Sequence, residues 1–413
     1  MPLADLINTF IAIIMRYHKL YSRWLITCLL LLPAVSYSDT SSDEVGSESF
    51  KPSFNKPRSD LHINGFLTVG VNHADPEVTS TNESYRSDLS FDTKAILGLQ
   101  ATYQLTSKLN VTGQIVSKAD KDWGLDTDLD WAFFRYHLAD DLTFRAGRLR
   151  LPLYFFSESA EVGFSYPWVT PPSEVYVVPL FDYEGADFLY SMSTGDWIHQ
   201  LQVFGGSVDT EILKASTTYG INLTSSSGPW TYRASFLEVN DAELNYSIFP
   251  QLESSFEIGD AIDYYAAAAI YDDGDWLLIS ELSVLDTGSS TVLFGKNSGY
   301  ITIGKYIDHW LPYFSYGKSY TTNEAPSEVL FELPVEFPPF SIPVYSDILE
   351  FTTTSYSLGL RYNLNANTSV KFQWSHFTDF DGTGGKFFNL RFSNSTADVD
   401  SVDTFALVID MVF

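Results

Sequence analysis

The chain has 413 residues, with 24 Lys and Arg against 52 Asp and Glu, and a formal net charge of -28 at pH 7. So acidic a chain lacks the basic clusters that phosphate backbones require, which argues against nucleic acid as a partner. Aromatic residues make up 16% of the sequence, yet the mean hydropathy is near zero, at -0.03. This balance is typical of strands that are apolar on one face and polar on the other.

The first 38 residues are predicted to be a secretory signal peptide. Three basic residues, Arg16, Lys19 and Arg23, precede the apolar run 24–35, and Ser-Tyr-Ser at 36–38 forms a small-x-small cleavage site. The run is too short for a membrane-spanning helix. Met15 would open a signal of normal shape by itself, so it is an alternative start. Cys28, the only cysteine, lies within this leader, so we expect no disulfide in the mature chain.

Residues 39–60 are rich in Ser, Asp and Pro, and we expect a flexible periplasmic lead-in there. From Leu61 onward the sequence alternates with a period of two, so 61–413 is predicted to be one all-β domain. In the segment 368–375, for example, Val370, Phe372 and Trp374 share one face while Lys371 and Gln373 share the other. After the leader no run reaches about 18 apolar residues, so a membrane could be crossed only by a closed barrel.

The connections between these segments alternate between short and long. Seven short polar turns are expected, at 106–108, 139–141, 194–196, 227–229, 272–275, 308–309 and 365–367. Longer segments lie between them, notably 152–183 and 320–350. Tight turns at one end and long loops at the other are the pattern of a transmembrane antiparallel β-barrel, and seven turns imply about 16 strands. A barrel with an export signal is expected in the outer membrane of a Gram-negative cell, in contact with lipid and lipopolysaccharide.

The final predicted strand is 404–413. Its odd positions form an apolar face that ends the chain, while Asp410 contributes acid to the inner face. This face resembles the C-terminal assembly signal of outer-membrane proteins, which the barrel assembly machinery recognises. The residues that carry the resemblance are Phe405, Leu407, Ile409, Met411 and Phe413.

The segment 142–176, LTFRAGRLRLPLYFFSESAEVGFSYPWVTPPSEVY, resembles the Gram-negative porin superfamily, which includes general and phosphate-selective porins. The matching pattern is a strand that ends in Arg-Ala-Gly-Arg and is followed by Pro and an aromatic loop. The resemblance implies a loop that follows the fifth strand and folds into the barrel to constrict it. It also implies passive diffusion of small hydrophilic solutes and ions through a homotrimer.

A constriction of this kind is an electrostatic filter in which basic wall residues face acidic loop residues. The basic candidates are Arg145, Arg148 and Arg150, and the acidic ones are Glu158, Glu161 and Glu174. A regular strand cannot point all three arginines inward. Either a bulge lies near Gly147, or Arg145 points the other way, or Arg148 and Arg150 brace the loop through its carboxylates. Four more basic residues fall on polar strand faces and are expected to line the lumen: Lys94, Arg233, Arg361 and Lys371.

Seven aromatic residues of the loop, among them Tyr154 and Trp168, have two interpretations: a slide for sugars, or packing that fixes the loop to the wall, which we favour. The alternative functions are a channel specific for a sugar, organic acid or phosphate, and a non-channel structural or adhesive barrel. The absence of Lys and Arg from 152–183 counts against phosphate. The run Asp126-x-Asp128-x-Asp130 lacks the Gly and Glu of a calcium loop. We therefore predict no cofactor, no metal and no enzymatic activity.

Overall fold

The computed structural model describes residues 60–79, 84–89, 94–119, 124–176, 182–210, 213–249, 252–258, 261–288, 295–322, 328–331, 340–343, 351–381, 384–387, 390 and 399–413. The predicted signal peptide and almost all of the predicted lead-in lie outside these residues. So does most of the segment 320–350. No described helix has the length and the apolar composition needed to cross a membrane.

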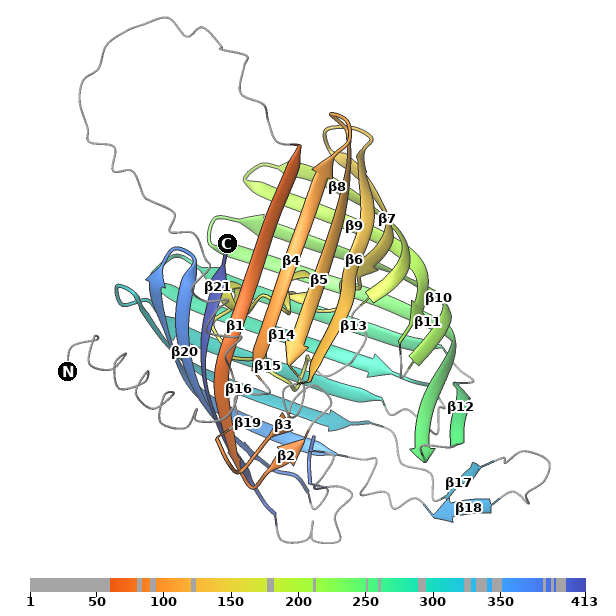
Figure 1. Ribbon diagram of the computed structural model, residues 1–413, viewed down its shortest axis with the longest axis vertical. Helices are drawn as coiled ribbons and strands as arrows, with labels where there is room; N and C mark the ends of the chain where they lie inside the picture. The colour runs from red at the N-terminus through yellow and green to blue at the C-terminus, as the bar shows by residue number, and fades with distance from the viewer. Residues whose placement is uncertain are drawn as a thin grey trace, which may run out of the picture. The chain divides into compact units, whose positions relative to one another are not determined.

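Sixteen strands of the described chain form one antiparallel sheet, in which each strand pairs with two neighbours (Figure 1). They are β1 (Leu61–Asp75), β4 (Ala95–Gln104), β5 (Leu109–Ala119), β6 (Leu125–His137), β7 (Leu142–Arg150), β8 (Asp182–Thr194), β9 (Trp197–Asp209), β10 (Leu213–Ser227), β11 (Trp230–Phe249), β13 (Ile262–Asp272), β14 (Trp276–Asp286), β15 (Lys296–Lys305), β16 (Trp310–Thr321), β19 (Thr352–Asn365), β20 (Thr368–Thr378) and β21 (Val402–Val412).

The sheet closes between its first and last strands. β1 pairs with β4 on one side and with β21 on the other, from Phe66↔Val412 to Asp75↔Asp403. The backbone of Phe413 continues the seam, because its N–H donates to Gly65 at 2.9 Å and its carbonyl accepts from Gly65 at 2.8 Å. Closure pairs each of the sixteen described wall strands on both sides, which is the condition for strands to lie in lipid. The predicted all-β barrel of about 16 strands is therefore confirmed.

All seven predicted short turns fall between consecutive strands of the wall, from the β4–β5 turn to the β19–β20 turn. The longer connections carry small additions: β2 (Val78–Thr79) with β3 (Ser84–Tyr85), and β17 (Glu328–Phe331) with β18 (Phe340–Pro343). β12 (Leu252–Ile258) extends the long strand β11 by one further pairing. The acidic run from Asp126 to Asp130 lies at the start of β6.

The two faces of the wall alternate as predicted. On β20, Phe372 is exposed on the outer face while Lys371 and Ser375 are buried on the inner face. On β21, Phe405 is exposed outside, and Thr404, Ala406, Val408 and Asp410 are buried inside. Exposed Leu, Ile, Val and aromatic residues dominate the outer surface, as a barrel in lipid requires.

The polar inner face typical of a barrel with a wet lumen does not extend to one part of the wall. Apolar inner residues continue across β9, β10, β11, β13 and β14, where they join the buried residues that follow β7 in a single cluster. Because these wall positions are buried, water does not line that part of the interior. The inner members from these strands are Phe204, Val208, Leu213, Ala215, Leu237, Val239, Ile262, Tyr264 and Ile279.

Candidate functional site

The segment 151–176, called the inner loop below, follows the fifth strand of the wall and lies inside the barrel. It contains two short 3-10 turns, η2 (Ser157–Ser159) and η3 (Gly163–Ser165). The Trp168 indole N–H donates to Thr302 Oγ1 on β15 at 3.0 Å and to Ser315 Oγ on β16 at 3.1 Å. β16 is half-way around the ring of strands from β7. The inner loop therefore crosses the interior and reaches the opposite wall.

Among the contacts of the described residues, eight basic side chains reach the inner loop, from the wall and from the β20–β21 connection. In a chain with only 24 Lys and Arg, this is a marked concentration. Five of them donate to loop backbone carbonyls or loop hydroxyls, two pair with loop carboxylates, and Lys371 donates to carbonyls as well as pairing with the wall residue Asp410. The eight are Lys94, Lys118, Arg145, Arg233, Lys296, Arg361, Lys371 and Lys386.

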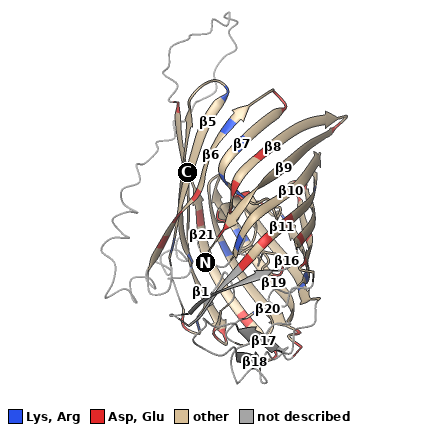
Figure 2. Ribbon diagram, turned by 90° about the vertical axis from the view of Figure 1, so that its right-hand side faces the viewer, with Lys and Arg blue, Asp and Glu red and all other residues tan. Residues whose placement is uncertain are grey.

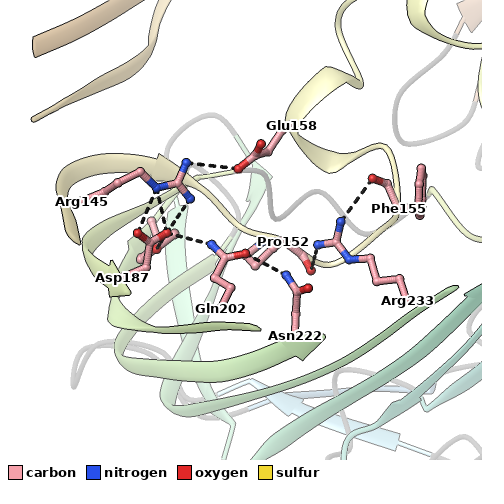
Figure 3. A network of polar contacts seen from close by, with 9 residues as sticks. Arg145, Pro152, Phe155, Glu158, Asp187, Gln202, Asn222 and Arg233 are labelled. Atoms are coloured by element: carbon pink, nitrogen blue, oxygen red, sulfur yellow. Dashed lines mark hydrogen bonds and ion pairs between the residues drawn. The ribbon is translucent and has the colours of Figure 1, made fainter. Parts of the chain in front are cut away.

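Arg145 lies on the inner face, buried beside its cross-strand partner Asp187 on β8. Its Nε donates to Asp187 Oδ1 at 2.9 Å, and its Nη2 lies 2.5 Å from Asp187 Oδ2. Asp187 also accepts from Gln202, and Gln202 in turn accepts from Asn222, so a polar row runs from β7 to β10 (Figure 3). Glu158 of the inner loop lies 3.3 Å from Arg145 Nη1, with 53% of its side chain exposed. This is the wall-to-loop pairing that the filter hypothesis expects.

The other two arginines form ion pairs with wall carboxylates, and Arg150 also acts electrostatically on Glu161 of the inner loop. The register of β7 is continuous with both neighbours, so no bulge lies near Gly147 and Arg148 has the opposite parity to Arg145. Arg148 keeps 37% of its side chain exposed, 3.6 Å from Asp182. Arg150 is buried, and its Nη2 donates to Asp130 at 2.8 Å.

The bulge of this neighbourhood lies in β6 instead, where Asp130 is the extra residue opposite Gln114 and Ile115. Gln114 Nε2 donates to Asp130 Oδ2 at 2.8 Å, which directs this carboxylate inward to Arg150. Asp130, the last member of the acidic run set aside as a calcium motif, is therefore part of the candidate site.

The three predicted acidic residues of the inner loop lie in three different places. Glu158 meets Arg145, and Glu161 forms an ion pair of 2.8 Å with Lys118 on β5. Burial by itself raises the pKa of Glu161. The positive charges of Lys118 and Arg150 lower it by more than burial raises it, so the pKa lies below its usual value. Glu174 is buried against the inner face of β16 near Gly317.

Four basic residues were predicted to line the lumen, and all four contact the inner loop. Arg233 donates to the carbonyls of Pro152 and Phe155 at 3.0 and 3.3 Å (Figure 3). Arg361 donates to the Tyr166 carbonyl at 3.0 Å. Lys94 donates to Thr170 at 3.0 Å, and Lys371 to the carbonyls of Gly163 and Trp168. They act as fasteners of the loop.

Glu281 on β14 holds both ends of the inner loop. Its buried carboxylate accepts from the Phe155 N–H at 2.8 Å, from the Tyr300 hydroxyl at 2.5 Å and from the Tyr176 hydroxyl. Phe155 lies near the start of the loop and Tyr176 ends it. Sequence reasoning missed Glu281, Asp187 and Asp130. The sequence feature that could have identified them is an acidic residue on the inner face of a strand. A carboxylate that is buried there needs a hydrogen-bond donor or a positive charge as its partner.

The aromatic residues of the inner loop are packed, which favours fixation over a sugar slide. Tyr154, Tyr166, Trp168 and Tyr176 are buried. Trp168 meets the Tyr300 ring edge-on at 5.5 Å, and Tyr154 meets Tyr176 at 4.5 Å. Ring contacts of this geometry stabilise the loop in addition to the stabilisation that comes from burying each ring.

Charged positions are distributed over many strands of the wall (Figure 2). The described residues hold no group of three or more His, Cys, Asp or Glu side chains that could bind a metal ion. The basic side chains that reach the interior instead form ion pairs with single carboxylates or donate hydrogen bonds to loop carbonyls and hydroxyls, as described above.

Neither the models of known protein families nor the sequences of curated proteins give a match to this chain. Solved structures do. An anion-selective porin from Comamonas acidovorans superposes with a TM-score of 0.54 at 11% identity, over 86% of this chain and 99% of that one. OmpF of Salmonella typhi gives 0.54 at 15% identity, over 86% and 97%. The outer-membrane channel DcaP of Acinetobacter baumannii gives 0.52 at 11% identity, over 86% and 97%. The fold of this chain is that of the outer-membrane porins.

Proposed function

We propose that this protein is an outer-membrane channel for passive diffusion of small hydrophilic solutes and ions. The observation that carries the proposal is the inner loop, which crosses a closed barrel and is fixed there by side chains from around the wall. A barrel built only as a surface scaffold has no need of such a loop. The structures that share the fold include a porin and a channel by name, which supports the same function.

The passage is narrow. Inner-face residues such as Thr112, Gln202 and Ser315, on well-separated strands, are buried although they face the interior. Side chains that line a wide aqueous pore would be exposed instead. We therefore expect a small conductance that the inner loop limits. Glu158 and Lys118 are the loop-contacting charges with the most exposed side chains.

Planar-bilayer recording tests the channel directly. Purified, folded protein should give stable open steps, and the reversal potential in a salt gradient then gives the ion preference. The absence of any conductance from protein that migrates as a folded barrel would contradict the proposal.

The outer face also supports a homotrimer. Exposed residues on β1, β4 and β5 are mostly aliphatic, for example Ile63, Leu99 and Ile115, with Tyr103 as the aromatic exception among the large exposed residues there. Other strands carry the Trp and Tyr residues that mark lipid interfaces, such as Trp276 and Trp310. An aliphatic face is suited to contact with a second copy. OmpT of Vibrio cholerae, with 11% identity and a TM-score of 0.53, is described in a trimer form. Cross-linking in detergent tests this state.

The apolar face that ends at Phe413 is proposed as the assembly signal. Its strand closes the barrel beside Gly65, so it must be placed before the seam can form. Deletion of Phe413 should reduce the amount of folded barrel in the outer membrane, while the same deletion should still permit refolding in detergent. Normal assembly of the deletion variant in cells would contradict this role.

A further inference from the structure

The inner wall opposite β7 carries a row of five hydroxyl side chains, one on each of five adjacent strands. The register pairs Thr302 with Ser315, Ser315 with Ser357, Ser357 with Ser375, and Ser375 with Thr404. All five are buried. The row therefore runs straight across β15, β16, β19, β20 and β21 without a charged residue.

Four of the five hydroxyls of this row are bonded in two pairs. Thr302 and Ser315 lie 2.7 Å apart, as do Ser357 and Ser375. Gln373 donates to Ser375 at 3.0 Å. A hydroxyl both donates and accepts, so each of these groups keeps capacity for a further partner.

A small cavity of about 20 Å³ lies between this wall and the loop residues 168–174. Ser315, Ser357 and Ser375 line it from the wall, and Trp168 and Glu174 line it from the loop. Its size gives room for only one or two water-sized groups.

Glu174 lines the cavity and has an acceptor that no described residue uses. The residue is 2% exposed, and its Oε1 accepts no hydrogen bond from the described residues. Gly317, on the inner face of β16, makes room for the carboxylate. A Cβ at this position would stand 2.8 Å from Glu174 Oε2. A buried carboxylate oxygen without a donor is costly, so the cavity favours an occupant that donates a hydrogen bond.

The charges around the cavity decide the class of occupant. Lys296 donates to the Glu174 carbonyl, Lys386 to the Ser173 hydroxyl and Lys94 to the Thr170 hydroxyl. Three ammonium groups next to this segment disfavour a cation, while the Glu174 carboxylate disfavours an anion. Uncharged hydroxyl groups satisfy both the carboxylate and the serines, and the Trp168 ring offers an apolar surface for carbon-bound hydrogens.

We propose that this cavity binds one end of a small uncharged polyol, of the size of glycerol or erythritol, whose hydroxyl donates to Glu174 Oε1. The proposal deepens the proposed function, and rests on it, because the ligand would reach the cavity through the lumen. A sugar ring is too large to be enclosed there, so only a terminal hydroxymethyl group enters.

Saturation-transfer NMR with erythritol on the full-length protein in detergent tests the site. The double variant Ser357→Ala and Ser375→Ala removes two hydroxyls that are hydrogen-bonded to each other, so neither is left without its partner. We expect it to weaken erythritol binding about tenfold, as the loss of two hydrogen bonds implies. Gly317→Ala should weaken it as well, because the added methyl displaces Glu174. The matched control is Ser319→Ala, a buried inner-face serine of β16 outside the cavity lining. Folding of each variant is checked by heat-dependent gel mobility.

Equal binding by the wild type, the double variant and Gly317→Ala would overturn the proposal, as would tighter binding of ammonium or inorganic phosphate than of erythritol at this cavity. 1,2-Dimethoxyethane, which has no hydroxyl donor, should not bind. Bilayer recording on the same preparation separates the two proposals. Conductance without erythritol binding contradicts the cavity site alone, and erythritol binding without conductance contradicts the channel alone.

Discussion

Lys371 on β20 and Asp410 on β21 form an ion pair of 3.0 Å inside the barrel, and their side chains are 0% and 1% exposed. Asp410 also accepts from Thr68 on β1 at 2.7 Å, and Lys371 donates to the carbonyls of Gly163 and Trp168. One buried pair thus joins the seam at which the barrel closes to the middle of the inner loop.

Removal of Lys371 alone should destabilise the barrel strongly. Lys371→Met leaves Asp410 as a buried charge without its partner, which typically costs about 3–5 kcal/mol in the free energy of unfolding. The double variant with Asp410→Asn removes both charges and should recover most of that loss. Urea unfolding in detergent, followed by the heat-dependent shift in gel mobility, measures both. Similar midpoints for the single variant and the wild type would show that the pair does not stabilise the barrel.

Removal of Glu281 should release both ends of the inner loop. Glu281→Ala leaves three donors, from Phe155, Tyr176 and Tyr300, without an acceptor, and each costs about 1–3 kcal/mol when it stays buried. Chymotrypsin should then cleave at the loop aromatics at least about tenfold faster. Current through single channels should also fluctuate more. Glu238→Ala on β11 is the control, since Glu238 does not contact the inner loop among the described contacts. Equal cleavage of both variants would rule out Glu281 as the fastener.

The ion pair between Glu161 and Lys118 should persist in mildly acidic solution. Burial raises the pKa of Glu161, but Lys118 and Arg150 lower it more, to below its usual value near 4.5. A group with a lowered pKa contributes its stability above the unfolded value and loses it as the pH falls through the folded value. The contribution of the Glu161–Lys118 pair to the conductance should therefore stay constant from pH 7 to pH 5 and change only below about pH 4.5. Glu161→Gln should lack the change at low pH, and a transition near neutral pH that this variant removes would contradict the assignment.

The wall of the barrel could be predicted because its physics is local. Alternation such as Val370, Lys371 and Phe372 assigns each residue to a face, and turns such as Asp273-Gly274 mark the strand ends without knowledge of the fold. The position of the inner loop after the fifth strand follows from the same count of strands. Each of these inferences depends on neighbours within a few residues.

The partners of the inner loop could not be predicted in the same way. Glu281 lies 126 residues from Phe155, and Lys371 lies 208 residues from Gly163, so only the closed ring brings them together. Parity correctly separated Arg145 from Arg148, but it could not locate the bulge at Asp130 that meets Arg150. The apolar inner wall of β9 to β14 broke the expected alternation for the same reason. Residues distant in the sequence cover this part of the wall and exclude water from it.

The ion preference of the channel should depend on Glu158 more than on the arginines. Arg145 and Arg150 are buried beside Asp187 and Asp130, which neutralise them, whereas Glu158 exposes half of its side chain. Glu158→Gln removes this exposed negative charge. Screening limits the effect of one such charge to a few tenths of a kcal/mol, so the ratio of cation to anion permeability should fall roughly twofold. Reversal potentials in a tenfold KCl gradient measure the ratio. Asp140→Asn, in the exposed β6–β7 turn, removes one negative charge elsewhere and should leave the ratio unchanged. A shift of the same size in both variants would mean that overall charge, and not the inner loop, sets the preference.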